Sequence, residues 1–166
     1  LFGGYPRYYY SSLLDTYQLL PAFLRKNILP VFLERIFHKK NLRRKLNTPK
    51  GVERYLLFMS EHDDILQEVL KPGVFLKTSK SEEYQNYFPE KKFVDFGKYL
   101  MYLDLKTWLA EESLMRSDKM TMAHGLEERV PVLDHRLIEL AFKIPTKWKV
   151  RRGGRSKWIF RQAMSK

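Results

Sequence analysis

Two places in the sequence concentrate side chains that could act on a charged substrate. Lys157 follows the glycine pair 153–154 and opens a stretch with helical patterning. An amine at a helix N-terminus, next to a flexible glycine loop, suits the oxygens of a phosphate group. The run Glu127, Glu128 and Arg129 supplies two carboxylates and a guanidinium in a second place. A carboxylate there could orient a cation or an amine or relay a proton, and an Arg fork suits another carboxylate.

The acids at 127 and 128 lie between two predicted helices. We expect the first helix over Ser113–Ala123, because this run contains no Gly or Pro and the preceding acids 111–112 suit a helix N-terminus. Gly125 tolerates the left-handed conformation that ends a helix. Asp134 has the chemistry of an N-cap for a second helix over His135–Lys143. The segment therefore predicts a helix, a bent loop and a second helix.

Several of these side chains also have purely structural interpretations. Arg129 could pair with Asp118 or Glu127 or bind a substrate, and a structural pair is favoured. Asp118 and Asp134 are interpreted as structural, and Glu128 as part of the scaffold. Lys157 could equally be one of 31 basic side chains at the surface. The methionines of the first helix are interpreted as core residues, namely Met115, Met120 and Met122.

Apolar spacing predicts helices along most of the rest of the chain. Ser11 or Ser12 is expected to cap a short helix through Leu20. Further helices are expected over 22–40 with a kink at Pro30, over 50–60, over 64–70, from Phe93 to Leu109, and over Ser156–Met164. Asp104 is expected to cap the segment that holds Trp108. Side chains expected to be buried near the C-terminus are Leu137, Ile138, Leu140, Ala141, Trp158, Ile159 and Ala163.

The composition predicts a single helical domain. The chain has 166 residues, of which 44% are hydrophobic, which is enough for one core. It contains no cysteine, which excludes disulfides and thiolate metal sites and fits a reducing cytoplasm. No apolar run approaches the roughly 20 residues that a membrane-spanning helix needs. We therefore expect a cytoplasmic protein with one region over 1–166 and a mobile connection at 77–92.

The net charge of +12, from 31 Lys and Arg against 19 acids, would suit a polyanion. The basic run 38–45 could bind nucleic-acid phosphates or form a solvated helix end. The second interpretation is favoured because no nucleic-acid-binding motif accompanies the run. His62 with Asp63 and Asp64 is interpreted as helix capping, and no metal site is predicted in this chain.

Three motifs together resemble one known family. The stretch Arg116–His124, followed by Glu127–Asp134, closely resembles the signature of glutamine-dependent asparagine synthetases. The first residues, Leu1–Tyr5, resemble the tail of that family's phosphate-site motif. The segment Gly153–Arg161 resembles its late GGxxK and LR pattern. The resemblance is strong at both ends of the chain and weak in the middle.

The resemblance implies a fold and an activity. In the family the complete synthetase domain is an α/β domain of the ATP-pyrophosphatase type, similar to adenine nucleotide alpha hydrolases, and this chain would be a mainly helical C-terminal fragment of it. The implied reaction adenylates the side chain of aspartate with ATP and amidates it with ammonia from glutamine. ATP and Mg²⁺ are implied for the full-length enzyme, and neither is expected on the fragment. Implied partners are the glutaminase domain and the upstream synthetase segment of the same chain, with a homodimer left open.

The resemblance also assigns site residues. Lys157 is the expected catalytic cation, because a fixed amine would stabilise the charge that builds on phosphate oxygens in the transition state. Glu127 is the expected catalytic acid. Arg129 and the N-terminal loop are expected to bind substrate or ATP, the loop through Gly3, Gly4 and Tyr5. We expect Glu127 and Lys157 to converge on one cleft that opens toward the beginning of the chain.

The sequence starts in mid-motif and without Met, which predicts a fragment of a longer protein. It lacks the acidic residues that the family places just before Leu1, the glutaminase half and the pyrophosphate loop. The fragment alone is therefore expected to be inactive. A related ATP-dependent amidotransferase with another acceptor, such as a β-lactam-forming or peptide-modifying enzyme, is one rival. A basic helical module that binds nucleic acid is the rival from another class.

Overall fold

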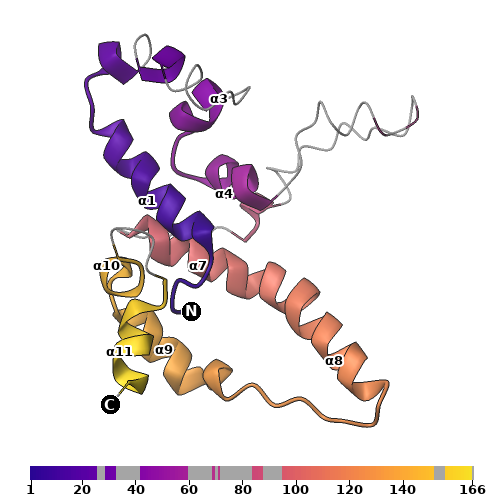
Figure 1. Ribbon diagram of the computed structural model, residues 1–166. Helices are drawn as coiled ribbons and strands as arrows, with labels where there is room; N and C mark the ends of the chain where they lie inside the picture. The colour runs from indigo at the N-terminus through magenta and orange to yellow at the C-terminus, as the bar shows by residue number, and fades with distance from the viewer. Residues whose placement is uncertain are drawn as a thin grey trace. The chain divides into compact units, whose positions relative to one another are not determined.

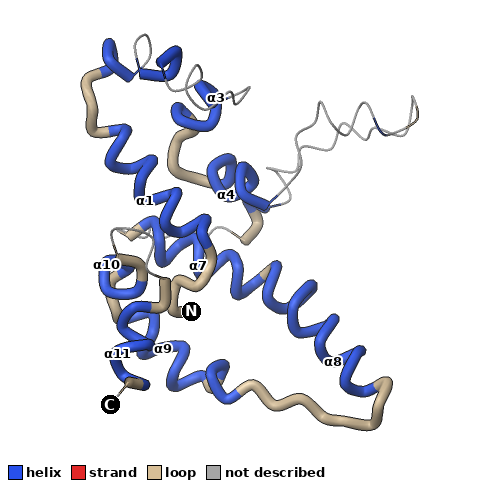
Figure 2. The backbone as a smooth tube through the Cα atoms, viewed as in Figure 1, coloured by secondary structure: helices blue, strands red, loops and turns tan. Residues whose placement is uncertain are grey.

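The computed structural model describes residues 1–25, 29–32, 42–59, 69, 71, 84–87, 95–151 and 156–165. This part of the chain is mostly helical and contains no β-strand (Figure 2). The prediction of a mainly helical chain is confirmed for these residues. No helix among them is long and apolar enough to cross a membrane. The contacts form two compact units, which are unit 1, Leu1–Tyr10 with Lys91–Lys166, and unit 2, Ser11–Glu90.

Helix α1, Pro6–Gln18, begins in unit 1 and continues into unit 2 (Figure 1). Its start corrects the prediction of a helix capped by Ser11 or Ser12. Proline suits the first turn of a helix, because its missing N–H would have no partner there and its φ is already helical. Ser11 lies in the middle of the helix and is buried.

Unit 2 also contains α3, Leu42–Asn47, and α4, Val52–Met59. Helix α4 confirms the helix predicted over 50–60, with shorter ends. The side chain of Arg54 on α4 is fully buried, donates to Gln18 Oε1 at 2.8 Å and pairs with Asp15. A buried guanidinium is stable only with such partners. This ion pair therefore joins α4 to α1 within unit 2.

Unit 1 is organised around one long helical segment. Helix α7, Phe96–Lys106, continues through the π-helical turn η2, Leu109–Leu114, into α8, Met115–Met122 (Figure 1). The prediction that a helix starts beside Glu111 and Glu112 is wrong, since the backbone N–H of Glu111 already bonds to the preceding turn at 2.9 Å. The sequence has no Gly or Pro between residues 98 and 124, so nothing local stops the helix.

The far end of α8 confirms a local prediction. Gly125 has φ +69°, its N–H bonds to Met122 O at 3.0 Å, and the N–H of Leu126 bonds to Thr121 O at 3.1 Å. These two bonds form a Schellman motif, in which glycine takes the left-handed position. The chain then leaves the helix as an extended loop.

The rest of unit 1 is made of short helices. They are η3, Pro131–Leu133; α9, His135–Lys143; α10, Thr146–Lys149; and α11, Trp158–Met164. Asp134 accepts from the backbone N–H of Arg136, so its predicted role as N-cap of α9 is confirmed. Leu140 and Ala163, predicted to face inward, are exposed, because the remaining faces of α9 and α11 make the contacts. The interpretation of Met115, Met120 and Met122 on α8 as core residues is also wrong, since all three are exposed.

The core of unit 1 lies where α7 meets the N-terminal loop, α9 and α10. Asp95 caps α7 and also accepts from the N–H and the hydroxyl of Thr146, at 2.8 and 2.7 Å, which ties the start of α7 to the start of α10. The buried apolar residues are Tyr8, Tyr99, Leu100, Met101, Leu103, Ala141 and Val150.

Asp104 corrects another prediction. It does not cap the segment of Trp108 but lies buried inside α7. Its carboxylate accepts from Arg7 Nε at 3.0 Å and from the hydroxyl of Tyr8. The partners of Asp104 come from the other end of the sequence, which local patterning cannot reveal.

Some predictions lie outside the described residues. These are most of the helix over 22–40, the first part of the basic run 38–45, the trio His62, Asp63 and Asp64, the helix over 64–70, most of the connection 77–92 and the glycine pair 153–154.

Candidate functional site

The N-terminal loop, Leu1–Tyr5, packs against the segment around α10. Gly3 has φ +70°, and a β-carbon there would lie 2.4 Å from Cγ2 of Val150 and 3.4 Å from Cβ of Lys149. Only glycine combines this backbone conformation with such close packing. The loop backbone therefore lies directly on the end of α10.

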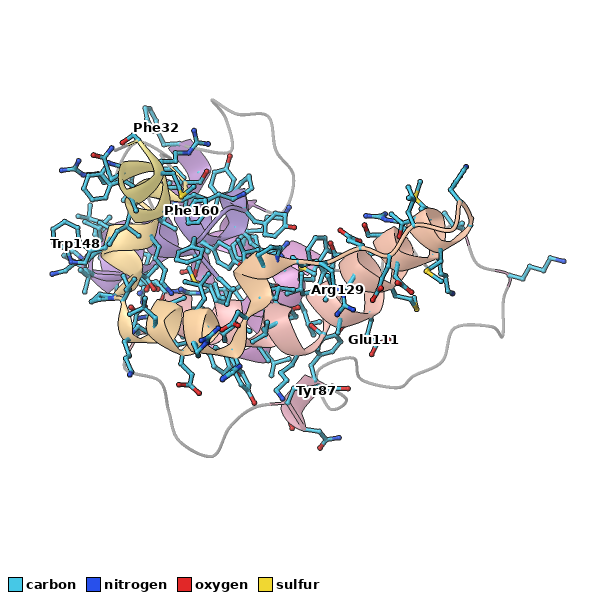
Figure 3. All side chains as sticks on the ribbon, turned by 90° about the horizontal axis from the view of Figure 1, so that it is seen from below. Phe32, Tyr87, Glu111, Arg129, Trp148 and Phe160 are labelled. Atoms are coloured by element: carbon cyan, nitrogen blue, oxygen red, sulfur yellow. The ribbon has the colours of Figure 1, made fainter. Side chains whose placement is uncertain are left out.

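The same loop meets α11, whose N-cap is Lys157. A β-carbon on Gly4 would lie 2.7 Å from Cε of Lys157 and 3.7 Å from its Nζ. The rings of Phe2 and Phe160 are 4.9 Å apart between centroids. Two of the motifs that resemble one family, from opposite ends of the chain, thus lie in contact. Figure 3 shows Phe160 on α11 in this part of unit 1.

The far side of the loop is held by aromatic and cationic contacts. Tyr5 meets Trp108 edge to face, with centroids 4.9 Å apart. The guanidinium of Arg7 lies 4.2 Å from the Tyr5 ring centroid and 5.3 Å from that of Trp108. Cation–π contacts of this kind attract Arg to the ring face. The loop is therefore fixed by contacts with Trp108, which lies between α7 and η2, and with α10 and α11.

Three cations lie close to the loop. A β-carbon on Gly3 would contact Lys149, one on Gly4 would contact Lys157, and the guanidinium of Arg7 lies over the Tyr5 ring. The charge of Arg7 is balanced by Asp104. The two lysines leave positive charge beside the loop that suits an anionic ligand.

Lys157 has an unusual backbone. Its φ is +53° and its ψ is +32°, and it is the non-glycine residue with positive φ in the described part of the chain. The left-handed conformation costs roughly 1 kcal/mol or more for a residue with a β-carbon. The helical patterning after the glycine pair predicted a helix here but not this strain.

Lys149 is a buried cation that the sequence analysis did not single out. Its side chain is fully buried, and its Nζ lies 3.6 Å from Sδ of Met101 and 5.4 Å from the ring centroid of Phe142. Burial, and then the charge of Lys98, lowers the pKa of Lys149 to about 8, against the opposite effect of Asp95. No sequence signal separates Lys149 from the other basic residues.

The signature loop after α8 presents the acids. Glu127 pairs with Arg129, with Oε1 and Nη2 2.6 Å apart, and both side chains are exposed. The structure therefore contains one of the two structural pairs considered for Arg129. Glu128 and Asp118 are also exposed.

Glu127 and Lys157 form no ion pair with each other, although both lie in the described part of unit 1. Figure 3 labels Arg129, the partner of Glu127, in the exposed loop, apart from Phe160 on α11. Lys157 lies beside Gly4 of the N-terminal loop. The cleft that Lys157 is expected to share with Glu127 stays a prediction.

Among residues with described positions, no group of three or more His, Asp or Glu side chains lies close enough to hold a metal ion. Two of the described acids, Asp95 and Asp104, serve as a helix cap and as an ion-pair partner. Lys157 is an exposed cation beside the N-terminal loop.

Comparisons with known proteins agree with the motifs. The profile of the family described as Asparagine synthase matches residues 1–166. The chain is 31% identical to asparagine synthetase [glutamine-hydrolyzing] 1 of Bacillus subtilis, over 98% of this chain and 26% of that protein. It is 30% identical to a putative asparagine synthetase of Mycobacterium tuberculosis, over 99% of this chain and 25% of that protein. The synthetase of Gallus gallus is 40% identical over 50 residues, which are 30% of this chain and 9% of that protein.

The chain spans about a quarter of the length of the relatives that it matches throughout. No solved structure matches it at a significant level. The match of the family profile over the whole chain is sufficient for an assignment at the level of the family. This chain therefore belongs to the asparagine synthase family.

Proposed function

We propose that this chain is the C-terminal part of the synthetase domain of an ATP-dependent, glutamine-hydrolysing asparagine synthetase. The observation that supports the proposal most is the contact between Gly4 and Lys157, because it joins two family motifs from opposite ends of the chain. The names of the relatives favour asparagine as the product over another amide. In such a synthetase the rest of the protein would supply the sheet and the glutaminase half.

The proposed reaction has two steps. A side-chain oxygen of aspartate attacks the α-phosphorus of ATP, and the bond to pyrophosphate breaks, which gives an aspartyl adenylate. Ammonia then attacks the activated carbonyl carbon, AMP leaves, and the nitrogen loses a proton to give the amide. Negative charge grows on phosphate oxygens in the first step, so a cation held in place beforehand lowers the barrier.

Lys157 is the proposed cation for this step. It is exposed, it lies beside the N-terminal loop, and a second lysine, Lys149, also lies against that loop. Glu127 is the proposed acid, which would orient the amine or accept its proton. Arg129 holds the Glu127 carboxylate in the structure and would bind a substrate carboxylate only by exchanging this partner.

The described residues do not fit a site for Mg²⁺, because they gather no cluster of acids. A cytoplasmic location and the inactivity of the isolated chain remain parts of the proposal.

The test is aspartate-dependent release of pyrophosphate from ATP by the full-length protein that contains this chain. Lys157→Met should lower kcat by roughly a hundredfold or more, the usual loss when a preorganised stabilising group is removed. The matched control is Lys147→Met, which removes an exposed amine on α10. Full activity in Lys157→Met, or no aspartate-dependent release by the unchanged protein, would exclude the proposed function.

A further inference from the structure

The fold does not call for a lysine at position 157. The residue occupies the left-handed region at φ +53°, where glycine or asparagine would be less strained. Strained backbone of this kind tends to persist where the side chain serves a function. The strain at position 157 therefore indicates a role for the lysine side chain itself.

The Lys157 side chain runs alongside Gly4. A β-carbon on Gly4 would lie 2.7 Å from Cε of Lys157 and 3.7 Å from Cγ. The stem therefore lies against the Gly4 backbone, in space that any larger residue would occupy. Ordinary contacts of a β-carbon begin at about 3.4 Å, so the Lys157 side chain would have to move.

Gly4 does not need to be glycine for its own backbone. The described glycines with positive φ are Gly3, Gly51 and Gly125, and Gly4 is not among them. The left-handed conformation that favours glycine is therefore not the reason for a glycine at position 4. Glycine at position 4 is thus explained by the space that its missing side chain leaves for Lys157.

Both sides of this contact are held in place by other groups. The ring of Phe2 packs against that of Phe160, which ties α11 to the loop. Tyr5 contacts Trp108 on the other side of Gly4. The loop backbone beside the Lys157 side chain therefore has aromatic contacts on both sides of Gly4.

We propose that Gly4 is a positioning residue, which clears the path of the Lys157 side chain and so sets where its ammonium group meets the substrate's phosphate oxygens. This rests on the proposed function of Lys157. Gly4 itself supplies no charge and need not touch the substrate. A misplacement of about 1 Å in a catalytic group can cost roughly a hundredfold in rate.

The first experiment measures geometry in this chain. Lysines of the unchanged chain and of Gly4→Ala are acetylated with acetic anhydride, and the rate at each lysine is followed by mass spectrometry. We expect a changed rate at Lys157, unchanged rates at the exposed Lys106 and Lys147, and the same thermal midpoint. An unchanged rate at Lys157 would contradict the proposal. A lowered midpoint would assign Gly4 to the fold instead and would also overturn it.

The second experiment measures the consequence in the full-length protein. Gly4→Ala should lower kcat for pyrophosphate release by roughly ten- to a hundredfold, with KM for ATP and aspartate little changed, because the substrate-bound ground state does not depend on the ammonium position. In the Lys157→Met background, Gly4→Ala should have no further effect on kcat.

The outcomes separate the two proposals. If Lys157→Met abolishes activity while Gly4→Ala retains it, the positioning role is wrong and the proposed function stands. If Gly4→Ala lowers kcat equally in both backgrounds, Gly4 acts independently of Lys157 and the positioning role is again wrong. If Lys157→Met is fully active, the proposed function itself fails.

Discussion

Arg7 and Asp104 form a buried ion pair, with Nη2 and Oδ2 2.8 Å apart and side chains only 12% and 7% exposed. The pair joins the first turn of α1 to the last turn of α7 within unit 1. The hydroxyl of Tyr8 donates to the same carboxylate, and burial together with this acid raises the pKa of Tyr8. The N-terminal loop with Gly4 directly precedes this anchor, so the placement of the loop depends on it.

Asp104→Asn should therefore destabilise unit 1 by about 3 kcal/mol or more. Removing one charge leaves the Arg7 guanidinium buried without its counter-ion, and such losses cost roughly 3–5 kcal/mol. The chain has three tryptophans, and all of them, Trp108, Trp148 and Trp158, lie in unit 1. Denaturant unfolding followed by tryptophan fluorescence therefore reports on this unit.

The control for this variant is Glu112→Gln. Glu112 pairs with Arg116 at 2.7 Å, but both side chains are at least half exposed. An exposed pair contributes about 1 kcal/mol at most. Equal effects of the two substitutions would show that the Arg7–Asp104 pair does not hold unit 1 together.

Local signals in the sequence were sufficient for some elements. Asp134 caps α9, Gly125 ends α8 through a Schellman motif, and the predicted bounds His135–Lys143 are those observed. Each of these features depends on residues within about one helical turn of each other. A sequence pattern contains all the groups involved, so the prediction needs no tertiary information.

Predictions that depended on distant partners failed or were never made. Asp104 has the composition of a cap but is buried, because Arg7 and Tyr8 reach it from the other end of the chain. Lys149 looks like any surface lysine until α7 covers it. The π-helical turn around Glu111 keeps α7 and α8 continuous where local acids indicated a helix start. Part of the candidate site was found through motifs, but its contact geometry required the fold.

Alanine substitutions at Gly3 and Gly125 separate the free-energy cost of a steric clash from that of backbone strain. Their φ values are +70° and +69°, but a β-carbon on Gly3 would lie 2.4 Å from Val150, whereas nothing lies within 4 Å at Gly125. Gly125→Ala should cost about 1 kcal/mol from strain alone. Gly3→Ala should cost about 1–3 kcal/mol more, because the core must shift. Equal losses in fluorescence-monitored unfolding would contradict the close packing of the loop on α10.

Lys149 should make the stability of unit 1 rise with pH above about 8. Its pKa is about 8 in the folded chain and 10.5 when unperturbed, so between these values the unfolded chain binds more protons. Stability therefore increases with pH across this window, by up to about 2 kcal/mol between pH 8 and pH 9.5. Below pH 8 the Lys149 amine is charged in both the folded and the unfolded chain, so the free-energy cost of burying this charge is fully present. The measurement is a series of denaturant midpoints in this range.

The matched variant for the pH series is Lys149→Met, which has similar length and no charge. It should be more stable than the unchanged chain at pH 7 and should lose the rise with pH. Measurements stay below pH 10, because burial raises the pKa of Tyr8 and Tyr99 and makes stability fall at higher pH. The same pH dependence with and without Lys149 would show that another group titrates.

Lys157→Gly should separate stability from activity. Glycine removes the strain of the left-handed conformation at φ +53°, and this gain outweighs the added freedom of the unfolded chain, for a net stabilisation of about 0.5–1 kcal/mol. The control is Lys147→Gly inside α10, where glycine should cost about 1 kcal/mol. In the full-length protein, Lys157→Gly should lower kcat for aspartate-dependent pyrophosphate release by roughly a hundredfold or more, as Lys157→Met does. If Lys157→Gly is destabilised as much as Lys147→Gly, the Lys157 side chain supports the fold. The strained backbone at position 157 would then be explained by stability and not by function.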